Sequence, residues 1–164
     1  MTAMSYDVIR ALFDHPGQGS VSMLRPDGSA AAGSPFNPGS IWGAWGVAID
    51  GNDHVWVANF APNGGLTELC GARTDTWPAG MKTGDAISPP GGFKGGGMQL
   101  LVDVQIDAAG NVWTDNNWQN LDSCYQKAPE GLSTECGGQG FVVFYGMAKP
   151  VRAPLIGPAR PLEN

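Results

Sequence analysis

The sequence is poor in charge, and the charge it has is mostly acidic. Charged residues make up 15% of the 164 residues, and 9 Lys and Arg stand against 15 Asp and Glu, a formal net charge of −6. Without a basic stripe the chain lacks the electrostatic footprint that binds phosphates, so we expect no nucleic-acid partner. No apolar run approaches the roughly 20 residues that cross a bilayer, so we expect no membrane partner.

Cysteine is scarce, and its spacing excludes two common kinds of small protein. The three cysteines are Cys70, Cys124 and Cys136, too few for a disulfide-dense miniprotein and without a C-x-x-C metal knuckle. Cys124 and Cys136 bracket a polar stretch and are expected to form a disulfide in an oxidising compartment, with Cys70 free. The chain start shows no signal peptide, which predicts a cytoplasmic protein, or a secreted or periplasmic one if the natural gene has an upstream signal.

Glycine and proline are abundant instead, and they indicate many short elements. The chain has 25 Gly and 13 Pro, yet 42% of its residues are hydrophobic, as in a globular protein. This composition argues against a helix bundle and favours an all-β fold in a single domain. The one short helix we expect covers residues 6–14.

An internal repeat gives the clearest structural signal. Residues 47–59 align without gaps onto residues 104–116, an offset of 57 positions. Each copy alternates apolar and polar residues on both sides of a short polar turn, which is typical of a β-hairpin. The turns begin with Asp50 and Asp107, whose side chains can accept hydrogen bonds from backbone amides two residues on.

Further strands are expected around the two hairpins. Residues 66–69 follow an Asn-Gly turn, and residues 141–145 form the clearest apolar strand of the chain. Residues 151–156 are expected to add an edge strand, because their prolines cannot lie in a central one. Residues 21–24, before another turn, are interpreted as the third strand of an earlier, incomplete unit.

The first copy reads Trp-Gly-Val-Ala-Ile-Asp at 45–50, Val-Trp-Val-Ala-Asn at 55–59 and Leu-Thr-Glu-Leu at 66–69. These segments resemble a blade of the NHL-type β-propellers and of the virginiamycin B lyase-like propellers. The resemblance implies a partial β-propeller of two to three four-stranded antiparallel blades, in which Trp56 and Trp113 are core residues. A single incomplete domain over 1–164 is predicted, with a partial blade at 21–40, a blade at 41–99 and a blade with a long insertion at 100–160.

A ring of blades needs more units than this chain carries, because propellers close with about four to eight. We therefore expect further propeller blades, or another copy of the chain, as partners. Blade topology places the long insertions on one face, where aromatic residues on a rigid scaffold favour binding. Trp42, Phe93 and Trp118 are the expected binding residues, for an unknown small molecule or protein.

The alternative function is a metal-dependent propeller enzyme of the lyase or lactonase type, with a divalent metal such as Ca²⁺ or Mg²⁺. The lyases resembled here use His and Glu on one face, but residues 42–46 and 100–103 contain no His. We therefore assign no catalytic residue, no metal ligand and no cofactor, and expect a binding or scaffold module. His54, beside a turn on the opposite face, is interpreted as a dispensable polar turn residue.

Overall fold

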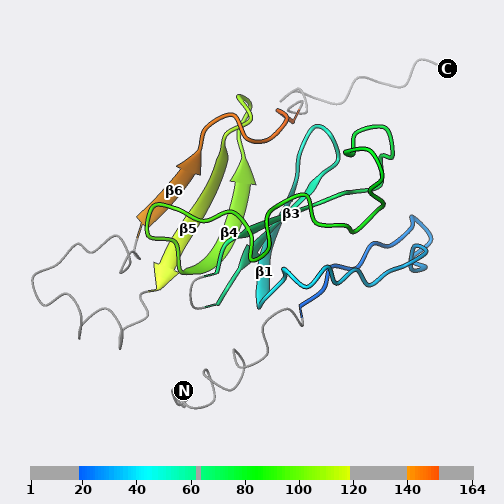
Figure 1. Cartoon of the computed structure of the whole chain (residues 1–164), viewed down its shortest axis with the longest axis horizontal. Coiled ribbons are helices and arrows are strands. Elements are labelled where there is room, and N and C mark those ends of the chain that lie inside the picture. Colours follow the sequence, from blue (N-terminus) through cyan, green and yellow to red (C-terminus); the bar gives the residue numbers. More distant parts are fainter. Residues whose placement is uncertain (1–18, 62–63, 119–139, 152–164) are drawn as a thin grey trace, which may run out of the picture.

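Six β-strands in two antiparallel sheets make up the regular structure of the chain (Figure 1). The computed structural model describes residues 19–61, 64–118 and 140–151, and within these ranges it contains strands and no helix. The predicted all-β class is therefore confirmed. The expected helix at 6–14 lies outside the described residues.

Each sheet has three consecutive strands in the order of the sequence. The first sheet contains β1 (Ala44–Ile49), β2 (Val55–Asn59) and β3 (Leu66–Leu69), and the second contains β4 (Leu100–Ile106), β5 (Val112–Trp118) and β6 (Gly140–Phe144). The two hairpins, β1–β2 and β4–β5, are those that the internal repeat predicts.

The two hairpin turns are built alike around a carboxylate. Asp50 accepts hydrogen bonds from the backbone amides of Asn52 and His54, at 2.8 and 3.0 Å. Asp107 accepts the equivalent bonds at 2.8 and 3.0 Å, so the predicted role of both turn carboxylates is confirmed. The left-handed position of each turn falls on Asp53 (φ 66°) and on Gly110 (φ 83°).

A fourth regular strand is not found in the described part of either sheet. Beside β3, its place is taken by an irregular segment that forms single bridges from Ala86 to Leu69 and from Phe93 to Leu66. The glycines and prolines at 89–97 interrupt the extended backbone there, which explains why the fourth strand that a four-stranded blade would need is irregular. Beyond β6, the expected edge strand at 151–156 lies outside the described residues after Val151.

An asparagine at equivalent positions of the two units makes the same hydrogen bond in each. Asn59 at the end of β2 accepts the backbone amide of Trp42 at 2.9 Å. Asn116 of β5 accepts the amide of Gln99 at 3.0 Å, at positions exactly one repeat further on in the alignment. Each asparagine therefore ties the chain entering the first strand of its sheet to the second strand.

The two sheets pack face to face, with β4 against β1 and β2. Trp56 is fully buried between them, and the remaining core side chains come from both sheets and from the segments before β4 and after β6: Ala58, Leu66, Met98, Leu101, Val104, Val112 and Ala148. Gly46 allows a short distance between β1 and β4. A Cβ added at this position would lie 2.6 Å from the Cα of Asp103 and 2.8 Å from the carbonyl oxygen of Val102. The absence of a side chain at Gly46 thus lets β1 and β4 touch.

The other face of the first sheet is covered over β2 and β3 by the segment that precedes β1. Ile41 packs on Val57 and Leu69, with Val21 at the edge of this small cluster. Residues 21–24, the expected third strand of an earlier unit, form only isolated bridges, from Val21 to Phe36 and from Leu24 to Ala30. Whether 21–40 belongs to a partial blade stays a prediction.

Trp113 does not share the environment of Trp56, although the repeat aligns them. Trp113 is 41% exposed, so its predicted place in the core is wrong. The physical reason is that it lies on the face of the second sheet turned away from the first, which no described element covers. Its indole Nε1 donates to Asp107 at 2.9 Å instead.

We expect Gly46→Ala to lower the free energy of unfolding by about 1–3 kcal/mol, because the new Cβ forces β1 away from β4. Thermal or urea denaturation measures the change. Gly140→Ala in β6 is the matched control, since a Cβ there meets nothing within 4 Å. An equally small effect at both glycines would contradict the close approach.

Candidate functional site

The two ends of the sheets carry different groups of polar and aromatic residues. The turn end holds the β1–β2 and β4–β5 turns, with the start of β2 and the end of β3. The loop end holds the start of β1 and β4 and the end of β2 and β5. All three residues expected to bind a ligand belong to the loop end, whereas His54 belongs to the turn end.

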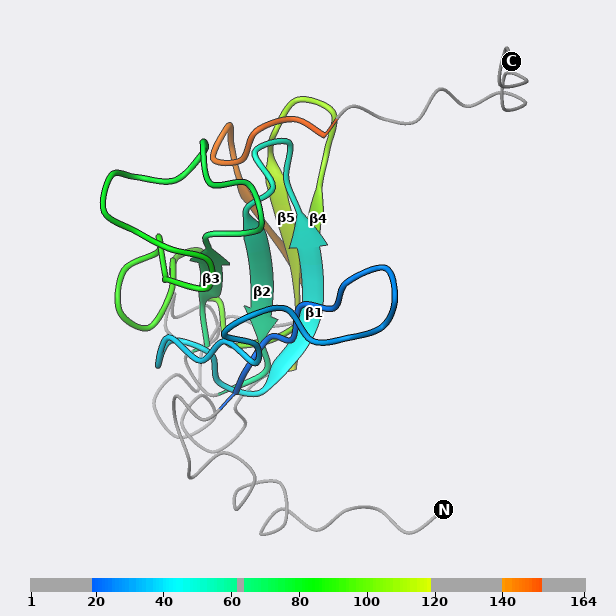
Figure 2. The same ribbon diagram turned by 90° about the vertical axis from the view of Figure 1, so that its right-hand side faces the viewer.

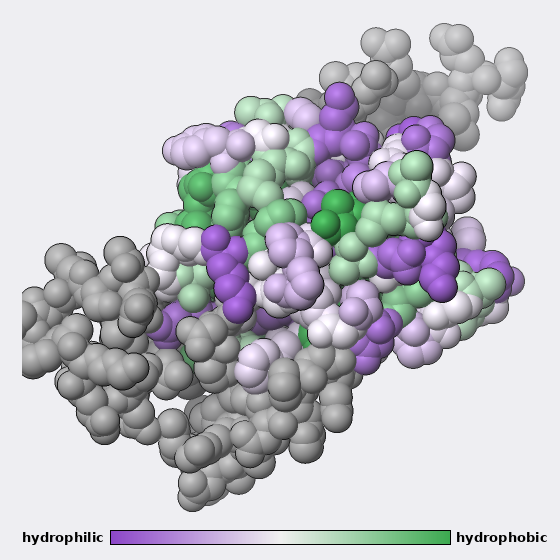
Figure 3. All heavy atoms as spheres, viewed as in Figure 1, coloured by the Kyte–Doolittle hydropathy of each residue, from purple (hydrophilic) through white to green (hydrophobic). Residues whose placement is uncertain are grey.

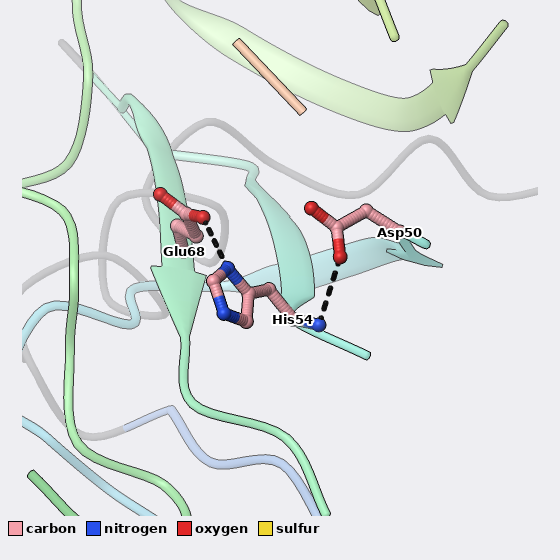
Figure 4. Close-up of side chains that lie close together, drawn as sticks. All are labelled: Asp50, His54 and Glu68. Carbon is pink, nitrogen blue, oxygen red and sulfur yellow. Dashed lines mark hydrogen bonds and ion pairs between the residues drawn. The ribbon is translucent and has the colours of Figure 1, made fainter. Parts of the chain in front are cut away.

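Three ionisable side chains gather at the turn end: Asp50, His54 and Glu68 (Figure 4). His54 Nδ1 lies 2.8 Å from Glu68 Oε1, and both side chains are only 10% exposed. On the other side of the ring, Nε2 lies 3.2 Å from the carbonyl oxygen of Thr76. The histidine therefore joins the start of β2 to the end of β3 and to the loop that follows it.

Both nitrogens of the His54 ring have partners within the protein. Both ring nitrogens have an oxygen atom within hydrogen-bond distance, Glu68 Oε1 for Nδ1 and the Thr76 carbonyl for Nε2. The tautomer of the ring decides which of the two nitrogens donates. A proton shared with Glu68 Oε1 offsets the cost of burying a carboxylate.

Burial raises the pKa of Glu68, because removing the carboxylate from water penalises its charged form. The hydrogen bond and the charge of His54 act in the opposite direction, and the negative charge of Asp50 adds to the increase. The net direction is upward, so desolvation outweighs the histidine. A proton is held more tightly here than on an exposed glutamate.

The donor chemistry of the three residues is that of a metal site, but their bonds are already used. One ligand atom from each residue lies within 4.8 Å of the others. Asp50, however, accepts its two turn amides and also the amide of Lys149 at 3.1 Å, which ties the chain after β6 to this turn. A cation would have to break the hydrogen bond between His54 and Glu68, so the site fits a hydrogen-bonded clamp better than a metal centre.

Comparison with the second repeat shows which residue of the Asp50, His54 and Glu68 cluster is part of the hairpin turn in both units. At its equivalent positions stand Asp107 and Asn111, and Val143 of β6 lies where Glu68 lies in β3. Asp107 keeps the turn bonds and gains donors from Asn111 and Trp113, and these hydrogen bonds, that of the Trp113 indole first, hold its pKa well below the ordinary value. The carboxylate is thus a common turn element, and only the His54–Glu68 pair is particular to the first sheet.

At the loop end, the backbone of each predicted binding residue is held at the end of a different strand. The amide of Trp42 bonds to Asn59, Phe93 bridges to Leu66 at the start of β3, and Trp118 pairs with Leu100 at the start of β4. The ring of Phe93 stacks on buried Trp56 with centroids 5.8 Å apart, so it is part of the core surface. Trp42 is half-buried.

Two buried polar atoms at the loop end have no hydrogen-bond partner among the described residues. They are Ser40 Oγ and the indole Nε1 of Trp42, two positions apart in the chain. The same holds for the indole nitrogens of Trp56 and Trp77 elsewhere in the described ranges. Buried donors without partners are uncommon and mark places where a water or a ligand is needed.

Sequence reasoning missed Glu68 and the hydrogen bond that His54 makes to it. His54 lies beside the turn, as expected, and its ring is buried and bonded to Glu68. That His54 is dispensable for ligand binding stays a prediction. The sequence did contain one signal for this pair: Glu68 is a charged residue inside the strand predicted at 66–69. The matching position of the second unit has an apolar residue, Val143. Cys70 is free, as expected, and it is buried, whereas Cys124 and Cys136 lie outside the described residues.

Comparison with protein-family models, with curated proteins and with solved structures finds no match to the chain. Among the described residues, no helix has the length and apolar character needed to span a membrane.

We expect His54→Ala to lower the free energy of unfolding by about 1–3 kcal/mol, because Glu68 stays buried without a donor. Chemical denaturation measures the loss. Glu68→Gln is the comparison, since its amide oxygen can still accept from Nδ1 at nearly the same volume. Full stability of His54→Ala would show that the pair contributes nothing to folding.

The stability difference between the wild type and Glu68→Gln should depend on pH. A raised pKa in the folded state means that the acid contributes its full stability below the unfolded pKa of about 4.3 and loses it as the pH rises through the folded pKa. The wild type should therefore weaken relative to Glu68→Gln as the pH rises above about 4.3. Denaturation series at several pH values measure this, and a difference that grows in favour of the wild type would contradict it.

Proposed function

We propose that this chain is part of a propeller-like scaffold that binds a small molecule or a protein at its loop end. Further blades, or another copy of the chain, would complete the scaffold. The observation that carries the binding proposal is a pair of buried donors that have no partner among the described residues. They are Ser40 Oγ and Trp42 Nε1, at the end where Phe93 and Trp118 also lie.

The arrangement of the sheets supports the propeller-like part of the proposal. Two units related by a sequence repeat stack face to face, their first strands touch at Gly46, and each unit runs from its first to its third strand in chain order. Blades of a propeller stack in this manner, since one sheet alone cannot bury both of its faces. The repeated asparagine and aspartate bonds give both units the same internal construction.

The hydrogen bonds of His54 and Glu68 argue against catalysis at the turn end, which favours a binding function. A general base needs a nitrogen or oxygen that can reach a substrate. In the cluster, both ring nitrogens of His54 are bonded within the protein, and Glu68 Oε1 is bonded to one of them. His54 and Glu68, the residues that would act as acid or base, therefore already hold β2, β3 and the following loop together.

The second candidate remains a metal-dependent propeller enzyme, because Asp50, His54 and Glu68 have the donor set that a divalent cation takes. In that function the cation would be held at the turn end by these three residues. It would polarise an oxygen of the substrate. The two candidates therefore place the working site at opposite ends of the sheets.

An NMR titration separates the two ends. The protein is screened against libraries of metabolites and short peptides, and separately against Mg²⁺, Ca²⁺, Mn²⁺ and Zn²⁺. We expect ligand-induced shifts at the loop end, in the amides of residues 40–43, 59–61 and 93–100, and no response of the His54 ring to any of the four cations.

Two variants serve as controls for this titration. Trp42→Phe removes the unpartnered indole donor and should weaken a loop-end ligand by about threefold to thirtyfold, whereas Glu68→Gln should leave its affinity unchanged. Shifts that gather around His54 and disappear in Glu68→Gln would favour the metal-dependent enzyme instead.

A further inference from the structure

We propose that the outer face of the second sheet binds an arginine side chain carried by a peptide segment of a partner protein. The outer face is the one turned away from the first sheet. It has a hollow of about 130 Å³, lined by the carboxylates of Asp103 and Asp115 and by the rings of Trp113 and Phe141. The site is separate from the loop end and does not depend on ligand binding there.

Strand register gathers these side chains on one face. Trp113 and Asp115 lie two positions apart on β5, so both point to the same side of the sheet. Asp115 pairs directly with Phe141 of β6, and Trp113 pairs directly with Gln105 of β4. The carboxylate of Asp115 therefore has an aromatic neighbour along its own strand and another across from it.

The outer face is exposed in the part of the chain that the structure describes. Phe141 is 76% exposed and Trp113 is 41% exposed. In Figure 2 the segment at 19–41 crosses in front of β1 and the second sheet lies behind the first, so this segment is on the opposite side of the molecule. Apolar side chains also gather over the second sheet on the side drawn in Figure 3, with polar ones beside them. A carboxylate set among such groups acts more strongly on a nearby charge than one surrounded by water.

The hydrogen bonds around the hollow leave it rich in acceptors. The side-chain donors that line it each donate within the protein: Trp113 Nε1 to Asp107 at 2.9 Å, Gln105 Nε2 to Asp103 at 3.2 Å, and Thr114 Oγ1 to the carbonyl oxygen of Asp103 at 2.7 Å. The bond to Asp107 also fixes the orientation of the Trp113 ring. A ligand that matches this hollow must therefore supply the donors itself.

The two carboxylates are held in place but their charge is not balanced. Asp115 Oδ1 accepts the backbone amide of Asp103 at 2.7 Å, and Asp103 Oδ1 accepts that of Val104 at 2.8 Å. Asp115 Oδ2 accepts no hydrogen bond from the described residues. The ion pairs found among these residues involve neither carboxylate. The outer face therefore presents two negative charges that no described cation neutralises.

An arginine side chain matches this combination of groups. Its guanidinium has a positive charge and several N–H donors in one plane but no acceptor, so it can pair with a carboxylate and stack on an aromatic ring at once. The net charge of −6 also attracts basic segments to the chain. A neutral sugar can stack on the rings too, but its hydroxyl groups need donors as well as acceptors. The donors of the hollow are already in use, which favours arginine.

The free edge of β6 favours a peptide as the carrier of the arginine. β6 pairs with β5 on one side, and no strand of the described ranges pairs with its other edge. An extended segment laid along this edge would gain backbone hydrogen bonds and point alternate side chains to the outer face, beside Phe141. Free arginine lacks this backbone, and its own carboxylate is repelled by Asp103 and Asp115.

An NMR titration of the full chain with two short peptides tests the proposal. The probes are acetyl-Gly-Arg-Gly-amide and the same peptide with citrulline, which keeps the shape of arginine without its charge. We expect amide shifts at residues 103–105, 113–115 and 141–143, a shift of the Trp113 indole N–H, and a dissociation constant of about 1 mM. The citrulline peptide and free arginine should bind at least about tenfold more weakly.

Three variants test which groups bind the peptide. Asp115→Asn removes the charge but keeps an acceptor for the Asp103 amide, and it should weaken the arginine peptide by about tenfold. Phe141→Leu keeps an apolar side chain without the ring and should weaken it by about threefold to tenfold. Asp27→Asn is the matched control, since it also removes one exposed carboxylate but lies in the segment at 19–41, and it should leave the affinity unchanged. Circular dichroism melts check that each variant is folded.

Several outcomes would overturn the proposal. One is the absence of shifts up to about 20 mM peptide. Another is equal binding of the citrulline peptide, which would show that charge has no part in it. Equal weakening by Asp27→Asn and Asp115→Asn would show only a general attraction to an acidic chain. Neutral disaccharides are titrated in parallel, and stronger shifts of the same residues by a disaccharide would assign the face to carbohydrate instead.

Discussion

The contact of β1 with β4 at Gly46 is the constraint on which the rest of the structure depends. A glycine at this position allows the two backbones to touch, and the touch brings the faces of both sheets close enough to bury Trp56 completely. Once Trp56 is enclosed, Leu66, Val104 and Val112 pack around it from both sides. The directions of β1 and β4 at this contact then determine where the turns and loops at their ends lie.

Polar side chains set the ends of the strands and leave the faces free for packing. Asp50 and Asp107 close the two hairpins, and Asn59 and Asn116 hold the chain that enters each sheet. His54 and Glu68 add a bond that the second unit lacks. Buried polar groups thus occur where they join segments, and each bond replaces the water that burial removes.

The sequence alone predicts the parts of this fold that rest on local patterns. Alternation and the repeat identify both hairpins, the strand at 66–69, a strand predicted at 141–145 that is found one residue earlier at 140–144, and the turn role of Asp50. They do not predict that Trp113 is exposed, because that depends on which faces are covered, and Trp56 has the same local sequence. Nor do they predict the His54–Glu68 bond, which joins residues of two strands and exists only once β2 and β3 are paired.

Differences between the two repeats follow from their unequal positions in the stack. The inner face of the first sheet must accept another sheet, and it has Gly46, Ala48 and Ala58. At the same positions the second sheet has Asp103, Gln105 and Asp115, whose polar side chains suit water. A stack of repeats needs such a polar end for solubility. Among the described residues, the second sheet therefore combines carboxylates with its exposed aromatic rings on its outer face, whereas β1 exposes only apolar side chains there.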